Sequence, residues 1–291
     1  MSGGTLRDVP PVPVGDIQLY DSLIPEIYGG DYAITVSHDA PSVLAKGVSA
    51  VQRFTVSAPQ FGVDPGEIAQ RYPPDGSTGR FDDVLPFVVL STPELPWERR
   101  TPQPGHPWLA VLVLAENEIT GGTGPTLTTS TSVAEYLALT DALVPPIIPE
   151  SDVAPTQPCS CLRLPAATFT AVMPRLEETR YLAHVRVVNT ADKPGDNFSQ
   201  HGAFSVVVAN RFPAAPPPEG SATRNIVHLV SIEGLGPWLV DDPVFTRSGR
   251  SDGSPVFGTV ALLSLASWTF QSVADPAENF AGLTLDLLES E

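Results

Sequence analysis

Short apolar runs without helical spacing recur along the whole chain. Each is six to eight residues long, rich in β-branched side chains and bounded by Pro, Gly, Asp or Asn. Runs of this length and composition are typical of β-strands. The eight runs are 32–37, 51–56, 84–90, 108–114, 181–188, 204–209, 226–232 and 260–265. They predict a mainly β fold: a large β-sandwich or barrel-like domain with a few short helices and long Pro-rich loops.

The runs differ in how polar residues interrupt them. Residues 109–114 are apolar at every position, whereas 51–56 alternate between apolar and polar side chains with one slip. A strand that is apolar throughout needs cover on both faces, and an alternating strand needs it on one. We therefore expect continuous runs in central strands and alternating runs in outer strands.

Three segments carry helix start signals. In 64–72, Asp64 is a cap, Pro65 takes the first helical position and Glu67 lies three residues after the cap. In 132–139, Ser132 and Glu135 form a Ser-x-x-Glu capping box, and 275–280 repeats the Asp-Pro-x-Glu start. Three short helices are too few to alternate with eight strands, which disfavours a doubly wound α/β sheet.

Composition limits the classes of protein that this chain can be. It contains 32 prolines and 23 glycines among 291 residues. Proline is excluded from helix interiors, so a long-helix or coiled-coil protein is ruled out. With 42% hydrophobic and 17% charged residues, the chain also differs from sequences that remain disordered.

Pro-rich and Gly-rich segments suggest how the chain is divided. Residues 1–27 are predicted to form an extended arm that lies across a neighbouring subunit or wraps its own domain, and 28–291 to form the β-rich domain. A Gly/Thr-rich stretch at 120–132 and a polyproline-like stretch at 212–221 mark either an inserted subdomain at 120–212 or two long surface loops.

Charge and the N-terminus restrict partners and location. The net charge is −17 and Lys and Arg form no cluster, so neither nucleic acid nor an anionic membrane is an expected partner. The most apolar stretch, 256–273, is too polar to span a bilayer. The N-terminus lacks the apolar core of a signal peptide. We expect synthesis in the cytoplasm without a Sec signal, which is compatible with release as part of a particle.

Motifs for catalysis are absent from the sequence. It has no Gly-Lys-Ser/Thr phosphate loop, no Gly-x-Gly-x-x-Gly and no Gly-x-Ser-x-Gly. Glu116 and Glu118 suit a solvated strand end better than a glycosidase pair. Cys159 and Cys161 are a redox pair, half of a metal site or two ordinary buried thiols. Single histidines occur at His38, His106, His184, His201 and His228. We expect no catalytic residue, no metal and no cofactor.

Arginine next to an aromatic residue recurs at predicted loops and strand ends, and three tryptophans directly follow proline. These residue types are enriched in interface cores. The same pairs are equally typical of an Arg packed over a ring within one subunit. The interface candidates are Tyr28, Arg71, Tyr72, Arg80, Phe81, Trp97, Arg99, Trp108, Arg211, Phe212 and Trp238.

Several segments resemble uncharacterised bacterial proteins associated with phage-tail-like particle gene sets. The similarity lies mainly in residues 28–118, with a further match in the final Ser-Leu-Ala-Ser-Trp motif. The matching segments are 28–34, 81–86, 95–99, 107–118 and 264–268. The resemblance carries no catalytic motif and implies a structural or assembly component.

Together these features predict a non-enzymatic subunit that assembles with copies of itself and with other particle subunits. The alternative is a β-sandwich binding module, for example for carbohydrate, with exposed Trp97, Trp108 or Trp238 as a stacking platform.

Overall fold

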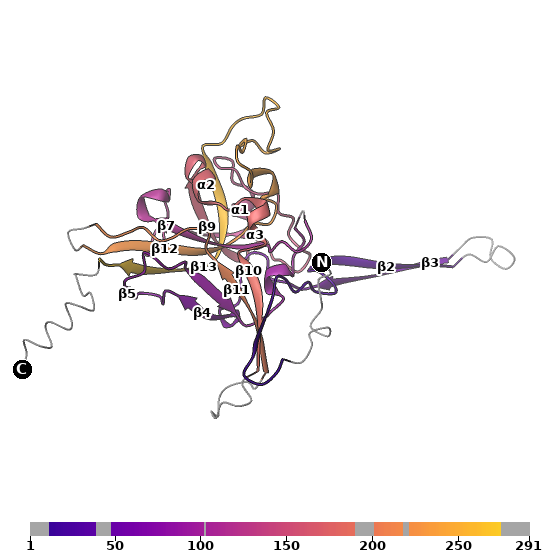
Figure 1. Ribbon diagram of the computed structural model, residues 1–291. Coiled ribbons are helices and arrows are strands. Elements are labelled where there is room, and N and C mark those ends of the chain that lie inside the picture. The colour runs from indigo at the N-terminus through magenta and orange to yellow at the C-terminus, as the bar shows by residue number, and fades with distance from the viewer. Residues whose placement is uncertain (1–11, 39–47, 102, 190–200, 218–220, 275–291) are drawn as a thin grey trace, which may run out of the picture.

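Two antiparallel β-sheets packed face to face form the body of the protein (Figure 1). The structure is a computed structural model that describes residues 12–38, 48–101, 103–189, 201–217 and 221–274. The predicted β-sandwich class is confirmed, and each of the eight predicted strands is present.

The first sheet has five strands, and every pair of neighbours in it is antiparallel. In order they are β1 (Ile17–Tyr20), β10 (Ala183–Asn189), β11 (His201–Val208), β6 (Phe87–Leu90) and β4 (Ile68–Tyr72). Strand β1 therefore forms one edge of this sheet.

The second sheet is built around β13, which changes partners along its length. Its first part pairs with β9 and the rest with β12, and the register shifts between Leu229 and Val230. The order is β7 (Leu109–Ala115), β12 (Thr223–Ser231), β13 (Thr259–Ser272), β9 (Pro158–Pro165) and β8 (Thr129–Ser132), with β5 (Thr78–Gly79) parallel to β13.

The second sheet is buried on both faces. One face packs on the first sheet around Trp108 and Trp268, and the other packs under helix α2 (Ala166–Val172) around Phe169. Residues 109–114 contribute alternately to the two cores. The expected cover on both faces is thus confirmed, although β7 lies at the end of the strand order rather than at its centre.

The predicted helix at 64–72 is wrong. Asp64 Oδ1 accepts a hydrogen bond from Gly66 N at 2.8 Å and caps a single 3-10 turn, η2 (Pro65–Glu67). The chain then continues as β4, which pairs with β6. Pairing and burial on the sheet outweigh the local start signal, because a short helix gains most of its stability from tertiary packing.

The other two helix predictions had different outcomes. Helix α1 (Val133–Leu137) begins after Ser132, whose Oγ accepts from Glu135 N at 3.3 Å, so the capping box is confirmed. The predicted helix at 275–280 lies outside the described residues. Helix α3 (Leu176–Thr179) and the 3-10 turns η3 (Leu95–Trp97), η4 (Glu116–Glu118) and η5 (Gly236–Trp238) complete the elements.

The structure places the described part of the predicted arm and the segment 120–212 on the body of the protein. From Val12 onward the arm packs on the chain's own body: Val12 and Leu23 are buried, and β1 pairs with β10. Residues 1–11 of the predicted arm lie outside the described residues. The segment 120–212 supplies β8 and β9 to one sheet and β10 and β11 to the other, so it is an integral part of the sandwich.

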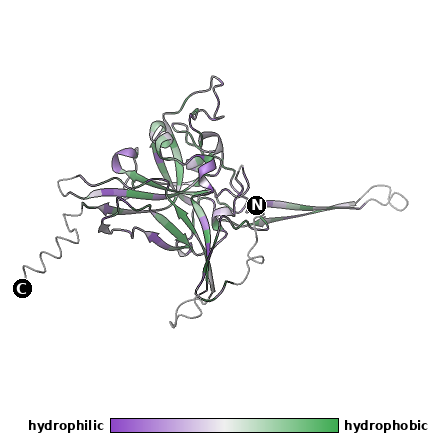
Figure 2. Cartoon of the chain, in the orientation of Figure 1, coloured by the Kyte–Doolittle hydropathy of each residue, from purple (hydrophilic) through white to green (hydrophobic). Residues whose placement is uncertain are grey.

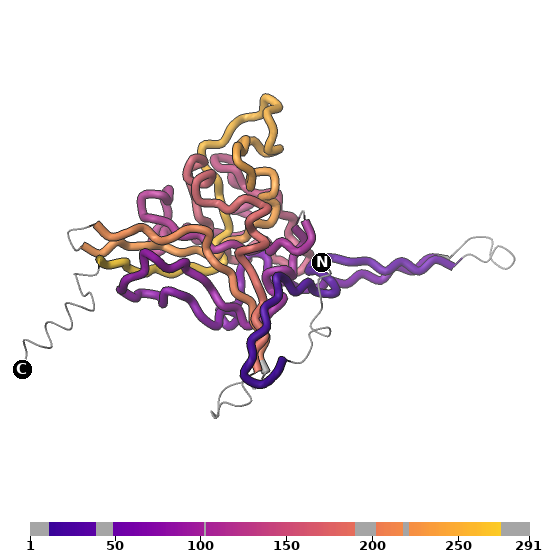
Figure 3. The backbone as a smooth tube through the Cα atoms, in the orientation of Figure 1, coloured from indigo at the N-terminus to yellow at the C-terminus, as the bar shows by residue number. Residues whose placement is uncertain are grey.

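A two-stranded hairpin lies apart from both sheets. Strands β2 (Gly30–His38) and β3 (Val48–Val56) pair along their whole length and extend away from the body (Figure 3). Each strand has nine residues, which corresponds to a length of about 30 Å.

The longest helix in the described part of the chain, α2, has seven residues. None of the helices described is long and apolar enough to cross a membrane.

Candidate interaction site

The projecting hairpin is amphipathic. Directly paired residues share a face of a two-stranded sheet, and the register pairs Tyr32 with Phe54, Ile34 with Gln52 and Val36 with Ala50. These pairs form the apolar face of the hairpin. On the polar face, Asp31 pairs with Thr55, Ala33 with Arg53, Thr35 with Val51 and Ser37 with Ser49.

The apolar face is open to solvent. The exposed fractions are 63% for Val36, 55% for Ile34 and 37% for Phe54, and hydrophobic residues follow the hairpin away from the body (Figure 2). The rings of Tyr32 and Phe54 stack at 5.5 Å. A strip of exposed apolar side chains of this kind is a candidate interaction surface.

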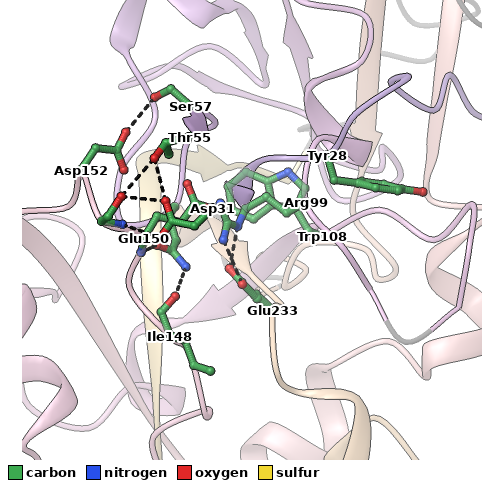
Figure 4. Close-up of polar contacts among 12 residues, drawn as sticks. Tyr28, Asp31, Thr55, Ser57, Arg99, Trp108, Ile148, Glu150, Asp152 and Glu233 are labelled. Atoms are coloured by element: carbon green, nitrogen blue, oxygen red, sulfur yellow. Dashed lines mark hydrogen bonds and ion pairs between the residues drawn. The ribbon is translucent and has the colours of Figure 1, made fainter. Parts of the chain in front are cut away.

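The polar face contacts the body where β2 begins and β3 ends, and we call this end of the hairpin its root. Ser151 Oγ donates to Asp31 Oδ1 at 2.6 Å, and Ser151 N donates to Asp31 Oδ2 at 3.1 Å. Thr55 Oγ1 donates to the same carboxylate at 2.7 Å, and Ser57 Oγ donates to Asp152 at 3.1 Å (Figure 4). The bonds from Ser151 and Thr55 lower the pKa of Asp31. An ionised Asp31 therefore holds both strands and the body together.

A buried arginine fixes the loop that carries Ser151. Arg99 Nη1 lies 2.7 Å from Glu150, and Arg99 Nε and Nη2 lie 2.7 and 3.0 Å from Glu233 (Figure 4). The Arg99 guanidinium also lies 6.0 Å from the ring of Trp108. Burial lowers the pKa of Arg99, but the bonds and charges of Glu233 and Glu150 outweigh it and leave this pKa raised. Arg99 is therefore charged, and it joins Glu150 to Glu233.

Two further contacts hold the root in place. Gln60 Nε2 donates to Ile148 O at 2.9 Å, and its Oε1 accepts from Glu150 N at 3.3 Å. Gly29 N donates to the Glu98 carbonyl at 2.7 Å, where a Cβ on Gly29 would overlap that of Ala58. The hairpin thus starts from a fixed position on the body.

A shallow hollow lies at the root. Its volume is about 330 Å³, and Tyr32, Arg53, Phe54 and Thr55 line it together with Ser151. No cluster of three His, Cys, Asp or Glu side chains is placed to hold a metal ion anywhere in the described part of the chain.

The tryptophans predicted as exposed platforms are buried. Trp97, Trp108 and Trp238 are each at most 1% exposed, and each indole N–H donates to a main-chain carbonyl, of Gly105, Leu95 and Val244 respectively. The expectation of an exposed tryptophan platform is therefore wrong. Arg99 is also interior at 5% exposure, so these four candidates stabilise the fold.

Most other candidates also have partners within the chain. Tyr72 stacks on Phe87 at 5.3 Å, and Phe81 packs edge-on against Phe270 at 5.6 Å. Arg211 makes a bidentate pair with Glu118 at 3.0 and 3.1 Å. Tyr28 lies under Arg100 at 5.7 Å. Arg71 is half-buried on β4 and Arg80 is exposed after β5. Phe212 is 55% exposed.

The cysteines and the strand histidines lie in the interior or within sheets. Cys159 and Cys161 are free and face one core from β9, where burial raises the pKa of both to about 11. His228 is fully buried on β12, with Nδ1 2.9 Å from Ser264 Oγ, and burial lowers its pKa to about 3. His184 lies on β10 next to Arg186.

Apart from Arg99 and Trp108, the residues that build this site were not among the candidates. Asp31, Ser57 and Ser151 carry no motif, and Thr55 appeared only as a polar position in an alternating run. The available signal was alternation in the hairpin strands themselves, where Tyr32, Ile34 and Val36 are separated by Ala33 and Thr35.

Comparison with known proteins identifies no relative: no family model, curated protein or solved structure matches this chain.

Proposed function

We propose that this protein is a non-enzymatic assembly subunit whose hairpin β2–β3 binds other subunits through its apolar face. The observation that supports this proposal is an anchored, amphipathic hairpin with an uncovered apolar face. The resemblance of residues 28–118 to proteins of phage-tail-like particle gene sets points to the same class.

The exposed face favours binding on energetic grounds. An isolated two-stranded hairpin is marginally stable in water, and covering an aliphatic or aromatic side chain stabilises by about 1.5 to 3 kcal/mol. Ile34, Val36 and Phe54 are 55%, 63% and 37% exposed, so a corresponding part of this stabilisation is still available at each. A partner that covers the strip stabilises both the contact and the hairpin.

Because its root is anchored, the hairpin is better suited to be a preformed interaction surface than a flexible linker. Asp31, Thr55 and Ser151 form one hydrogen-bonded group, and Arg99 fixes the loop beneath it. A surface held in its binding position loses less conformational entropy on association. The hairpin is thus prepared to bind before the partner arrives.

The test is the state of association of the full chain. We expect sedimentation velocity to show oligomers that grow with protein concentration, and negative-stain microscopy to show particles of regular shape. A chain that sediments as a monomer at every concentration contradicts the proposal.

A matched pair of variants assigns the interface to one face of the hairpin. Val36 lies on the apolar face at 63% exposure and Val51 on the polar face at 54%. Threonine preserves β propensity while adding a hydroxyl group. We expect Val36→Thr to weaken association about tenfold and Val51→Thr to leave it unchanged. Equal effects of the two substitutions would show that the apolar face is not the contact.

A further inference from the structure

A hollow on the body brings together three segments that lie far apart in the sequence. Its volume is about 410 Å³, and it lies among the loop after β1, the segment before β7 and the residues that join α3 to β10. The side chains that line it include Asp21, Ser22, His106, Arg180 and Tyr181. We call it the His106 hollow, because His106 is buried whereas the other four are more exposed.

Hydrogen bonds fix which nitrogen of the histidine carries the proton. His106 is 6% exposed, and its Nδ1 lies 2.9 Å from Thr179 Oγ1. Thr179 Oγ1 donates its only proton to Leu176 O at 2.7 Å, so toward the ring it can only accept. In neutral His106 the proton therefore lies on Nδ1, and Nε2 presents a lone pair.

The second ring nitrogen is accessible to solvent. The side-chain atoms that the described part of the chain encloses without a partner belong to Arg71, Asn210, His228 and Trp268. His106 Nε2 is not one of them, and it makes no hydrogen bond to a described residue. It is therefore exposed toward the space that His106 lines.

The imidazole of His106 is neutral at neutral pH. Burial is the main cause that lowers its pKa, and the positive charge of Arg180 lowers it further. A hydrogen bond to the Leu176 main chain and the charge of Glu177 act in the opposite direction without reversing the shift. Above pH 7, Nε2 therefore accepts hydrogen bonds and does not donate them.

Arg180 places a positive charge without a counter-ion at the same hollow. Its guanidinium lies 4.5 Å from the ring centre of Tyr181 and donates to the Tyr181 hydroxyl. None of the ion pairs in the described part of the chain includes Arg180. The hollow thus offers a bound ligand both a cationic donor and an uncharged acceptor.

We infer that the His106 hollow binds inorganic phosphate. At neutral pH this anion still carries a proton, so its charged oxygens accept from the Arg180 guanidinium while its hydroxyl group donates to His106 Nε2. The planar fork of an arginine can bond two phosphate oxygens at once. The inference adds a ligand to the protein and does not depend on the proposed assembly function.

Other ions satisfy this pair of groups less well. Sulfate and carboxylates carry no proton at neutral pH, so a negative oxygen would face the lone pair of Nε2. A phosphate ester loses its last proton at a pKa of about 6 and meets the same difficulty. A metal ion is repelled by Arg180, and no group of three His, Cys, Asp or Glu side chains among the described residues is placed to hold one.

Isothermal titration calorimetry of the full chain at pH 7.5 and constant ionic strength tests the inference. We expect phosphate to bind at one site per chain, and sulfate and methyl phosphate to bind about tenfold more weakly. Absence of phosphate binding, or sulfate binding of equal strength, overturns the inference. Equal binding of methyl phosphate overturns the assignment to the free ion.

Two arginine variants locate the site. Arg180→Gln removes the cationic donor, and we expect it to weaken phosphate binding about tenfold or more. Arg100→Gln is the matched control, because Arg100 is also exposed and lies over an aromatic ring, that of Tyr28 at 5.7 Å, but lines a neighbouring hollow. Equal losses in the two variants would show a diffuse attraction of anions and overturn the placement.

His106→Asn tests the part played by Nε2. The asparagine amide can still donate to Thr179, whereas no atom replaces Nε2. We expect this variant to lose the preference for phosphate over sulfate while its circular dichroism melting stays like that of the wild type. A preserved preference overturns the role of Nε2.

A chemical footprint of the wild type covers the case in which His106→Asn does not fold. Diethyl pyrocarbonate modifies neutral imidazole nitrogens, and mass spectrometry locates the modified histidine. We expect phosphate to protect His106 from modification and sulfate at the same ionic strength to leave it reactive. Equal modification with and without phosphate overturns the inference.

Discussion

Ser151 Oγ donates a 2.6 Å hydrogen bond to Asp31 Oδ1 across 120 positions of sequence. Asp31 lies at the start of the projecting hairpin, and Ser151 lies on a loop of the body held by Arg99 through Glu150. The bond therefore sets where the hairpin leaves the body.

Loss of the Asp31 carboxylate is expected to loosen the hairpin root. In Asp31→Ala the bonds from Ser151 and Thr55 have no acceptor, and we expect the amides of β2 and β3 to exchange with solvent about fivefold faster. Hydrogen exchange followed by mass spectrometry measures this. Asp252→Asn is the control, since Asp252 is also an exposed acceptor of two hydrogen bonds but lies in the loop before β13. Unchanged exchange in the hairpin would contradict the anchoring role of Asp31.

Removal of the buried Arg99 guanidinium is expected to lower the free energy of unfolding. Arg99→Met leaves Glu150 and Glu233 without their counter-charge, and breaking a buried pair in this way costs about 3 to 5 kcal/mol of unfolding free energy. Chemical denaturation provides the measurement. Arg163→Met is the matched control, because its partner Asp141 is 66% exposed and such pairs contribute about 1 kcal/mol or less. Similar losses in the two variants would contradict the structural role of Arg99.

Stability is expected to fall with acid because of His228. The unfolded chain protonates this residue near its ordinary pKa of 6.5, whereas the folded chain keeps it neutral down to about 3. The unfolding free energy is therefore unaffected by His228 above pH 6.5. It falls as the pH drops from 6.5 toward 3, by up to about 1.4 kcal/mol per pH unit. In His228→Asn this slope is absent. Parallel stability curves for the two proteins between these pH values would refute the assignment.

The thiols of Cys159 and Cys161 are expected to resist modification in the folded protein. With both pKa values at about 11, about one thiol in a thousand is ionised near pH 8, and the thiolate is the reactive form. Ellman's reagent should therefore titrate both thiols quickly in denaturant and slowly without it. Fast reaction of the folded protein would contradict the burial of the pair.

Association is expected to strengthen with salt. The chain carries a net charge of −17 and the proposed contact is apolar, so screening would reduce repulsion between subunits without weakening that contact. Sedimentation at low and at high ionic strength measures the change. An assembly that dissociates as salt rises would instead indicate ion pairs at the interface.

Periodicity was enough to locate the strands whose own residues carry the pattern. It identified 109–114 as a strand covered on both faces, which is confirmed. It also predicted 51–56 as an outer strand of the domain, whereas this segment pairs with β2 in a hairpin that lies apart from both sheets. It did not identify β8, which is entirely Thr and Ser, or β9, which begins and ends with proline. Strands of this kind owe their conformation to neighbours in the sheet.

Residue type was a poor guide to the site. Tryptophan and arginine suggested interfaces at Trp97, Trp108 and Arg99, yet these side chains are interior. The apolar strip that is exposed consists of Ile, Val, Phe and Tyr, the same residue types that fill the core. Local sequence does not distinguish the two, because exposure depends on what the rest of the chain brings to that face.

The sequence by itself determined the β-rich class, the absence of long helices and the alternation that makes the hairpin amphipathic, because each depends on residues adjacent in the chain. Only the tertiary structure decided that Asp31 meets Ser151, that Arg99 is enclosed by Glu150 and Glu233, and that the hairpin's apolar face lies uncovered. These are contacts between distant segments, and they follow from packing rather than from local propensity.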